Sequence, residues 1–246
     1  IHKVTRMQVL IVHCHPEPRS FNGALIEIAR DFFLENSDQV EISDIYAEQF
    51  DPVERASHYV NPENAEIFSA LAEQRNAYRT NSLPPEIVRE IERLERSDLV
   101  SFQFPIWWHS VPAMLKGWMD RVFVSGGLYT SSMRYDRGFF KGRRALCSVT
   151  SGAPAESFEP GGRGGEIEQI LWSTHFSLHY MGFEVLSPFA TFGVQGHGFS
   201  YAGKEEFTAL MEAAKLQWRD LLASLDDAPS LIFPGWDAWD ARGRPK

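Results

Sequence analysis

Hydrophobic positions along the chain fall into short apolar blocks that alternate with longer segments of helical spacing. The apolar blocks predict strands at residues 7–13, 40–46, 99–104, 144–151 and 182–188, the last with an extension at residues 190–194. Amphipathic spacing predicts helices at residues 21–34, 85–96, 112–123, 166–181 and 204–225, with a further helix around residues 62–77. Strands and helices therefore follow each other in the order typical of α/β proteins.

This alternation predicts one α/β domain over residues 1–246, a three-layer α/β/α structure around a five-stranded parallel sheet. Five strands joined by helices fit the doubly wound, flavodoxin-like order, in which ligands bind between the first and third strands. The block 40–46 alternates apolar and polar residues, so it belongs near an edge of the sheet. Two segments lie outside the alternation: an excursion at about residues 47–82, and an aromatic tail at about residues 229–246 that we expect to dock on the protein or on a neighbour.

Charge and composition limit the partners of the chain. The formal net charge is −9, and nucleic-acid-binding surfaces are basic, so we expect no nucleic-acid partner. No apolar run approaches the ~18 residues of a membrane span, and residues 1–7 lack the apolar core of a signal peptide. Cys14 and Cys147 both lie in predicted strands, which is typical of a reduced, cytoplasmic protein, although a bond between them stays open.

Polar and aromatic residues concentrate in three loops that follow the first, third and fourth predicted strands. In the flavodoxin-like order these loops meet at the carboxyl edge of the sheet, where α/β proteins bind ligands. The first loop and the helix behind it offer His15, Ser20, Phe21 and Asn22. Hydroxyl, amide and helix N-terminal N–H groups favour a phosphate there, while the simpler alternative is ordinary helix capping by Ser20.

The other two loops offer a different chemistry. The loop after the third strand is aromatic and consists of Pro105, Ile106, Trp107, Trp108 and His109. Aromatic faces at a strand end suit a flat conjugated ligand, and the alternative is a buried aromatic cluster beneath the excursion. The loop after the fourth strand presents hydroxyls and a permissive glycine where a ring edge can approach the backbone; it consists of Thr150, Ser151, Gly152 and Ala153.

Other catalytic chemistries have little support in the sequence. His13 and His15 share a face at a strand end, but no third ligand follows at a recognisable spacing, so we expect no metal site. No Gly-x-Ser-x-Gly motif or Cys/His nucleophile pattern occurs.

The chain resembles the NAD(P)H:quinone oxidoreductases of the flavodoxin-like fold, both the DT-diaphorase type and its bacterial quinone-reductase relatives. The likeness runs from about Met7 to Leu225. It is carried by Ser20-Phe-Asn22, Asp44-Ile-Tyr46, Phe50-Asp-Pro52, residues 98–105, Trp108, residues 111–118, Arg121-Val-Phe123, Tyr129 and Met181-Gly-Phe183.

The resemblance implies a homodimer that binds FAD at the sheet edge near the subunit interface, with NADPH or NADH as electron donor. It implies that the first loop holds the phosphates and that the third and fourth loops line the isoalloxazine ring. Tyr129 would lie over the open ring face, in a site of the partner subunit. Nicotinamide and a quinone would take turns there, in a ping-pong cycle of two-electron hydride transfer.

Three positions depart from the family pattern. A Tyr/His pair thought to stabilise the reduced flavin is replaced by Phe158 and Gly164, so the catalytic residues stay unknown unless Arg163 substitutes. The substrate pocket would then contain Tyr129, Phe158 and, in place of a second aromatic residue, Ser131. Two alternatives remain open: an FMN-dependent nitro- or azoreductase, and a flavin-binding regulatory subunit of a partner such as an ion-efflux system.

Overall fold

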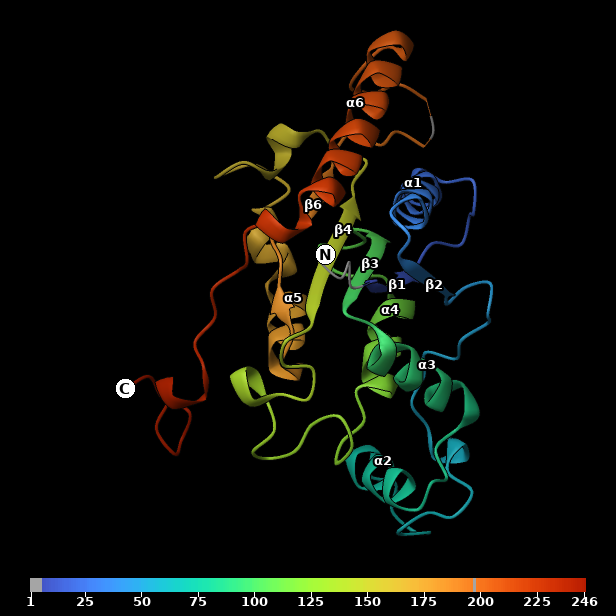
Figure 1. Ribbon diagram of the computed structural model, residues 1–246, viewed down its shortest axis with the longest axis vertical. Helices are drawn as coiled ribbons and strands as arrows, with labels where there is room; N and C mark the ends of the chain where they lie inside the picture. Colours follow the sequence, from blue (N-terminus) through green and yellow to red (C-terminus); the bar gives the residue numbers. More distant parts are fainter. Residues whose placement is uncertain (1–5, 197) are drawn as a thin grey trace, which may run out of the picture.

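The computed structural model describes residues 6–196 and 198–246, so part of the N-terminal segment considered above lies outside the described residues. A parallel sheet with strand order β2-β1-β3-β4-β5 forms its centre, and β6 also pairs with β4 (Figure 1). The strands are β1 (Gln8–His13), β2 (Gln39–Asp44), β3 (Leu99–Pro105), β4 (Arg144–Thr150), β5 (Glu184–Val185) and β6 (Phe189–Thr191). This is the doubly wound flavodoxin-like order, with β2 at an edge, as the sequence predicts.

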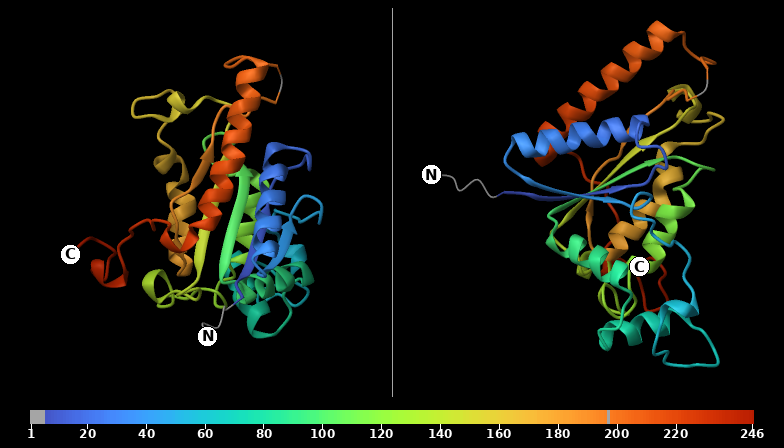
Figure 2. Two further views of the ribbon diagram at one scale, coloured as in Figure 1. Left: turned by 45° about the horizontal axis from the view of Figure 1, so that its top comes forward. Right: turned by 90° about the vertical axis from the view of Figure 1, so that its right-hand side faces the viewer.

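The helices form layers on both faces of the sheet. They are α1 (Phe21–Glu35), α2 (Ala70–Arg79), α3 (Pro85–Arg96), α4 (Ala113–Val122), α5 (Ile167–Met181) and α6 (Lys204–Ala223). The core on one face is contributed by α1 and α6, and the core on the other face by α3, α4 and α5. Figure 2 shows these layers in its right-hand view, with α2 lying below the second layer. Apolar side chains on both faces of β1 and β3 explain why these strands read as continuous apolar blocks.

The excursion between β2 and α3 is anchored on α4. A Cβ atom at Gly117 would lie 2.1 Å from the carbonyl oxygen of Pro52, so only glycine fits there. Arg121 on α4 donates a hydrogen bond to the carbonyl oxygen of Asp51 over 2.7 Å and pairs with Glu86. The excursion is therefore fixed to the helix that follows the aromatic loop.

A buried carboxylate joins three elements in the same layer. Glu90 on α3 is 1% exposed and accepts hydrogen bonds from Trp118 Nε1 (2.9 Å), Ser43 Oγ (2.7 Å) and Arg93 Nη1 (2.6 Å). Burial of a charge is costly unless it is paired, and here a cation and two neutral donors surround it. Trp118 therefore has a structural role.

The helix predicted around residues 62–77 is wrong in its first half. Residues 62–69 are irregular, and α2 begins only at Ala70. The Asn64 side chain accepts from the N–H groups of Glu66 and Ile67, and the Glu73 carboxylate accepts from the N–H of Glu63. Side chains that satisfy backbone donors locally compete with helix formation, and they do so here.

The predicted fifth strand is interrupted. Residues 184–185 and 189–191 both pair with β4, but the N–H of Ser187 donates to the carbonyl oxygen of Pro229 instead of to the sheet. Pro188 has no N–H to donate. The extension predicted to begin at Ala190 is thus a separate short strand, β6.

The aromatic tail packs on the protein, as expected for such a segment. Its two tryptophans, Trp236 and Trp239, lie 6.0 and 4.8 Å from Tyr135, measured between ring centroids. An ion pair between Arg137 and Asp237 adds a polar contact. Both cysteines are buried and free, and burial raises the pKa of each thiol to about 12. Within residues 6–196 and 198–246, no helix is long and apolar enough to cross a membrane.

Candidate functional site

The loops after β1, β3 and β4 meet at the carboxyl edge of the sheet, where backbone hydrogen bonds join them. The N–H of Cys14 donates to the carbonyl oxygen of Gln103 over 2.9 Å, and the N–H of Ile106 donates to that of Thr150 over 2.8 Å. Both bonds continue the parallel pairing beyond the strands themselves. Neighbouring strand ends thus bring the three sequence-predicted loops to one place.

A buried polar chain holds the start of α1 against the ends of β3 and β4. Asn22 Nδ2 donates to Thr150 Oγ1, and Gln103 Nε2 donates to Asn22 Oδ1, each over 2.9 Å. All three side chains are buried. A network of this kind has one favourable arrangement, because each buried group needs its partner. Asn22 and Thr150 therefore position the loop backbone.

The N-terminus of α1 keeps two backbone donors free. Ser20 is the N-cap residue, and its hydroxyl accepts from the N–H of Gly23, while its carbonyl oxygen accepts from Ala24. In the described part of the chain, the N–H groups of Phe21 and Asn22 have no acceptor. Capping and anion binding are thus compatible here, since Ser20 occupies only part of the helix N-terminus.

His15 and His13 lie close to this terminus but differ in their surroundings. The His15 ring accepts a hydrogen bond from the N–H of Glu17 at Nδ1 and lies 6.4 Å from the Trp107 ring. His13 is buried beside Asp44, 3.2 Å from its carboxylate, and burial lowers the pKa of His13 more than the carboxylate raises it. His13 therefore faces the sheet interior and β2, while His15 lines the loop.

The aromatic loop is a tight turn with both tip residues in the left-handed region. Trp107 and Ser110 exchange two backbone hydrogen bonds of 3.0 and 3.1 Å, and the residues between them, Trp108 and His109, have φ of 51° and 56°. Residues other than glycine rarely adopt this conformation, and it costs of order 1 kcal/mol or more per residue. The turn makes Trp108 96% exposed, so the alternative of a buried aromatic cluster is wrong for its tip.

The loop after β4 is tied to the strand that follows it. Ser151 N–H donates to the Thr191 carbonyl oxygen over 2.9 Å, and Ala153 N–H is directed to Ser151 Oγ. Gly152 is exposed, and a Cβ there would meet only the carbonyl oxygen of Val194 at 3.5 Å. The loop is therefore fixed at both ends with its glycine open to a ligand.

Phe158 and Gly164 lie close together beyond this loop. The Phe158 ring stacks on Phe192 with centroids 4.7 Å apart, and the N–H of Gly164 donates to the carbonyl oxygen of Ser157 over 2.7 Å. Arg163, the candidate substitute for the missing pair, directs its guanidinium to the Tyr201 hydroxyl at 3.4 Å. The structure therefore offers no proton donor from the side chains at positions 158 and 164.

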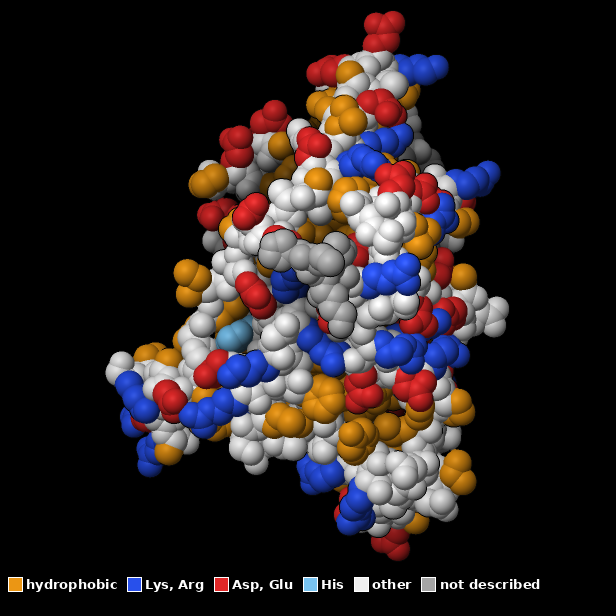
Figure 3. Space-filling model, in the orientation of Figure 1, with side chains coloured by type: hydrophobic (Ala, Val, Ile, Leu, Met, Phe, Trp, Pro, Cys, Tyr) orange, Lys and Arg blue, Asp and Glu red, His pale blue; other side chains and the backbone are white. Residues whose placement is uncertain are grey.

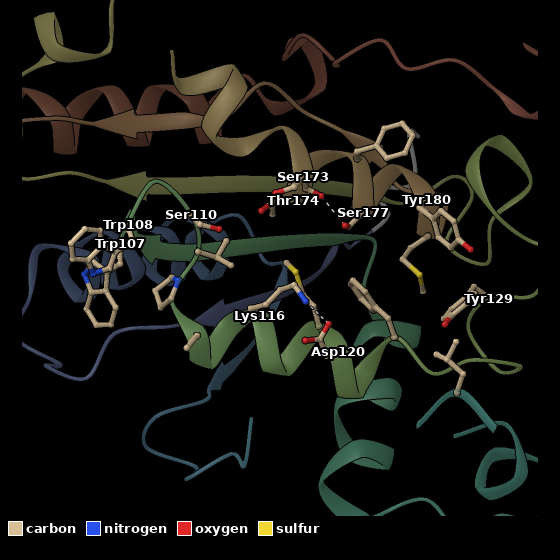
Figure 4. Close-up of a pocket in the computed structure, with 18 of the residues that line it drawn as sticks. Trp107, Trp108, Ser110, Lys116, Asp120, Tyr129, Ser173, Thr174, Ser177 and Tyr180 are labelled. Carbon is tan, nitrogen blue, oxygen red and sulfur yellow. Dashed lines mark hydrogen bonds and ion pairs between the residues drawn. The ribbon is translucent and has the colours of Figure 1, made fainter. Parts of the chain in front are cut away.

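A groove of about 730 Å³ runs between α4 and α5. Figure 4 shows Trp107 and Trp108 at one end, and Tyr129 and Tyr180 at the other. Tyr129 and Tyr180 pack edge to face with ring centroids 5.6 Å apart. Within one chain, Tyr129 thus lies at the opposite end of the groove from the aromatic turn.

Sequence reasoning missed the wall that α5 contributes to this groove. Ser173, Thr174, Ser177 and Tyr180 line it, opposite Lys116 and Asp120 on α4 (Figure 4). Small hydroxyl residues at positions 173, 174 and 177 share a helix face, which is the pattern that could have indicated a groove wall.

Comparisons with known proteins agree with the fold. Residues 7–222 match the sequence model of the flavodoxin-like fold, so the chain belongs to the flavodoxin-like family. It is 38% identical over 232 residues to mouse ribosyldihydronicotinamide dehydrogenase [quinone], covering 93% of this chain and 96% of that protein. It is 36% identical over 228 residues to rat NAD(P)H dehydrogenase [quinone] 1, covering 92% of this chain and 82% of that protein.

A solved structure agrees with these relatives. A protein from Klebsiella pneumoniae assigned as a quinone reductase superposes with a TM-score of 0.84 at 32% identity, covering 96% of this chain and 92% of that one. Within the flavodoxin-like family, the chain is therefore a member of the NAD(P)H:quinone oxidoreductase group, as the motifs predict.

Proposed function

We propose that the protein is an NAD(P)H oxidoreductase that binds FAD and reduces quinones or similar flat electrophiles by two electrons. The observation that carries this proposal is the convergence of three kinds of group at one sheet edge: free helix N-terminal donors, an exposed aromatic turn, and a glycine-centred loop. The relatives named above support the reaction class, since their names describe quinone-linked dehydrogenases.

The residues at this edge fit a flavin. The N–H groups of Phe21 and Asn22 at the positive end of α1 suit a phosphate, with Ser20 and His15 beside them. Trp107 and Trp108 present aromatic surface at the end of β3, as a ring system needs. A flavin held by these residues would supply the chemistry of hydride transfer between nicotinamide and the acceptor.

The contribution of the protein is positioning. The buried chain of Gln103, Asn22 and Thr150 fixes the end of β4, so that the open backbone at Gly152 is held in place. Preorganised N–H groups at a ring edge stabilise negative charge without reorganisation cost. Holding the nicotinamide donor in contact with the flavin ring accounts for much of the rate enhancement in such reactions.

A homodimer is part of the proposal, since one chain leaves its aromatic surfaces apart. The groove between α4 and α5 is flanked by exposed apolar side chains, among them Leu71, Trp107 and Trp108. A second copy covering the groove would bring Tyr129 of one subunit to the aromatic turn of the other. Clustered exposed apolar residues of this kind commonly mark protein interfaces.

The first experiment tests flavin binding. We expect the purified protein to be yellow, to bleach with NADPH or NADH, and to recover its colour when a quinone is added. The mass of the extracted flavin distinguishes FAD from FMN. A protein that takes up neither flavin refutes the proposal, and one that keeps flavin without nicotinamide turnover is a binding or regulatory subunit.

The second experiment tests the assignment of residues. We expect Trp108→Ala to weaken flavin retention more than Phe158→Tyr does, because the first removes aromatic surface from the turn. Equal retention in the two variants would contradict the site.

A mixing experiment tests the shared site. Trp108→Ala and Tyr129→Ala chains, each weak alone, are unfolded together, refolded and reconstituted with flavin. If sites combine Trp108 of one subunit with Tyr129 of the other, mixed dimers contain one intact site and regain activity. Sites formed within one chain would show no recovery.

A further inference from the structure

A second cleft, of about 820 Å³, opens beside Tyr129 on the side away from the aromatic turn. Its walls come from α2, from the segment 125–131 and from Arg134. It shares Leu71, Tyr129 and Tyr180 with the groove between α4 and α5, so the two spaces meet at the tyrosines. The cleft contains three arginines, Arg75, Arg79 and Arg134.

The three guanidinium groups have no carboxylate partner within 4 Å in the described residues. Several arginines elsewhere are paired, as Arg55 is with Asp51 and Arg219 is with Glu35. Arg75 and Arg79 are also four residues apart on α2, where like charges repel one another. Figure 3 shows lysine and arginine side chains over the region of α2, at the bottom of a molecule whose net charge is negative.

Local contacts hold these arginines in place, and Arg79 donates to Asn76 Oδ1 over 3.0 Å. Arg134 donates to the Tyr180 hydroxyl over 2.9 Å and to the Ser131 carbonyl oxygen over 2.8 Å. Its guanidinium also lies over the rings of Tyr180 and Trp236, 5.4 and 5.2 Å from their centroids. The stem of Arg75 crosses Gly126, which has φ of 80°, so closely that a Cβ at Gly126 would lie 2.5 Å from Arg75 Cγ.

Ser131 lies at the edge of the cleft. Its short side chain is exposed and borders the cleft. The small side chain leaves Arg134 and the α2 arginines facing one space beside Tyr129.

We propose that this cleft is an anion subsite that binds the phosphate or another oxyanion of a ligand whose flat ring lies at Tyr129. The proposal rests on the oxidoreductase function above, because that function places flat, ring-bearing substrates at Tyr129. Guanidinium groups are suited to oxyanions because they combine charge with several aligned N–H donors. Two ligands could supply the oxyanion: the nicotinamide dinucleotide through its phosphates, and the electron acceptor through an acidic group.

A binding measurement tests the cleft without catalysis. Calorimetry measures the affinity of the flavin-loaded protein for inorganic pyrophosphate. The same measurement is made on the Arg75→Gln and Arg134→Gln variants, and on Arg219→Gln, a control on α6. We expect about tenfold weaker binding in each cleft variant and no change in the control, since each loses one charge-assisted contact. Gln keeps the Cβ and Cγ atoms with which Arg75 packs on Gly126, so the Arg75→Gln variant should fold normally. Absence of binding to the unsubstituted protein, or equal affinity in all four proteins, would overturn the proposal.

Kinetics then identifies the source of the anion. In Arg75→Gln, kcat/KM is measured for NADPH, NADH, a neutral naphthoquinone and its sulfonated analogue. A loss of about tenfold confined to NADPH assigns the 2′-phosphate, and an equal loss for NADPH and NADH assigns the pyrophosphate. A loss confined to the sulfonated quinone assigns the acceptor, and unchanged values for all four overturn the subsite. If no pair of substrates reacts even in the unsubstituted protein, the proposed function fails, whereas the calorimetry still decides the cleft.

Discussion

The buried histidine of α5 makes a specific prediction about acid stability. His175 is 2% exposed, and its Nε2 atom has no hydrogen-bond partner in the described residues. Burial favours the neutral ring and lowers the pKa of His175 to about 4. In the unfolded chain the same ring has the ordinary pKa of 6.5.

The sign and size of the effect follow from linkage. Below pH 6.5 the unfolded chain binds a proton that the folded protein does not, so the free energy of unfolding falls as the pH falls. The contribution of the neutral His175 ring to the free energy of unfolding is complete above about pH 6.5 and is lost as the pH falls towards 4. A pKa of about 4 instead of 6.5 corresponds to roughly 3 kcal/mol in total, of which roughly 2 kcal/mol is lost between pH 7.5 and 5. His13, whose pKa is also lowered by burial, acts in the same direction.

Urea denaturation at several values between pH 7.5 and 5 measures this loss. We expect the unsubstituted protein to lose roughly 2 kcal/mol more over this range than His175→Phe, which keeps an aromatic ring but cannot be protonated. His109→Gln is the control, because His109 is exposed on the aromatic turn, and it should follow the unsubstituted protein. Parallel pH profiles for the unsubstituted protein and His175→Phe would refute the reasoning.

Three substitutions test the structural basis of the site. Ser20→Ala removes the N-cap of α1 and should lower the free energy of unfolding by about 1 kcal/mol, measured in urea. Gly117→Ala forces a Cβ against Pro52 and should lower the free energy of unfolding by about 1–3 kcal/mol, measured as a lower Tm. An unchanged Tm would mean that the excursion can move away from α4 without loss of stability. Trp118→Phe leaves the buried Glu90 carboxylate without one donor and should cost about 1.5–3 kcal/mol beyond the lost packing, whereas the additional change Glu90→Gln should recover part of this.

The order of the fold follows from the sequence because its central strands are largely apolar. Residues 9–13 and 99–104 are buried, with side chains on both faces of the sheet, so their pattern depends little on which neighbours they meet. The start of α2 was not predictable in this way. Its position depends on the Glu73 carboxylate, which accepts backbone N–H groups ten residues earlier in the chain, and helical spacing contains no sign of that contact.

The candidate site was predictable only in part, for a related reason. Topology alone places the loops after β1, β3 and β4 together, since parallel strands end at one edge. The left-handed conformation at Trp108 and the groove wall on α5 could not be predicted from the sequence, because both depend on how distant segments pack. The arginine cleft joins Arg75 with Arg134, which are far apart in the chain, and dispersed basic residues in an acidic protein give no sequence signal.

The structure shows the surroundings of the three positions at which the sequence is expected to depart from the family pattern: Phe158, Gly164 and Ser131. Phe158 and Gly164 have no side-chain hydrogen-bond donor, so at these two positions the loop after β4 can offer a ligand only backbone groups. Ser131 is a small residue that borders the cleft containing the three guanidinium groups beside Tyr129. On the proposed dimer, the arginine cleft would belong to the face that the other subunit contributes to the site. We expect its guanidinium groups to influence which substrates bind there, because binding pockets select by the few polar groups around an apolar surface.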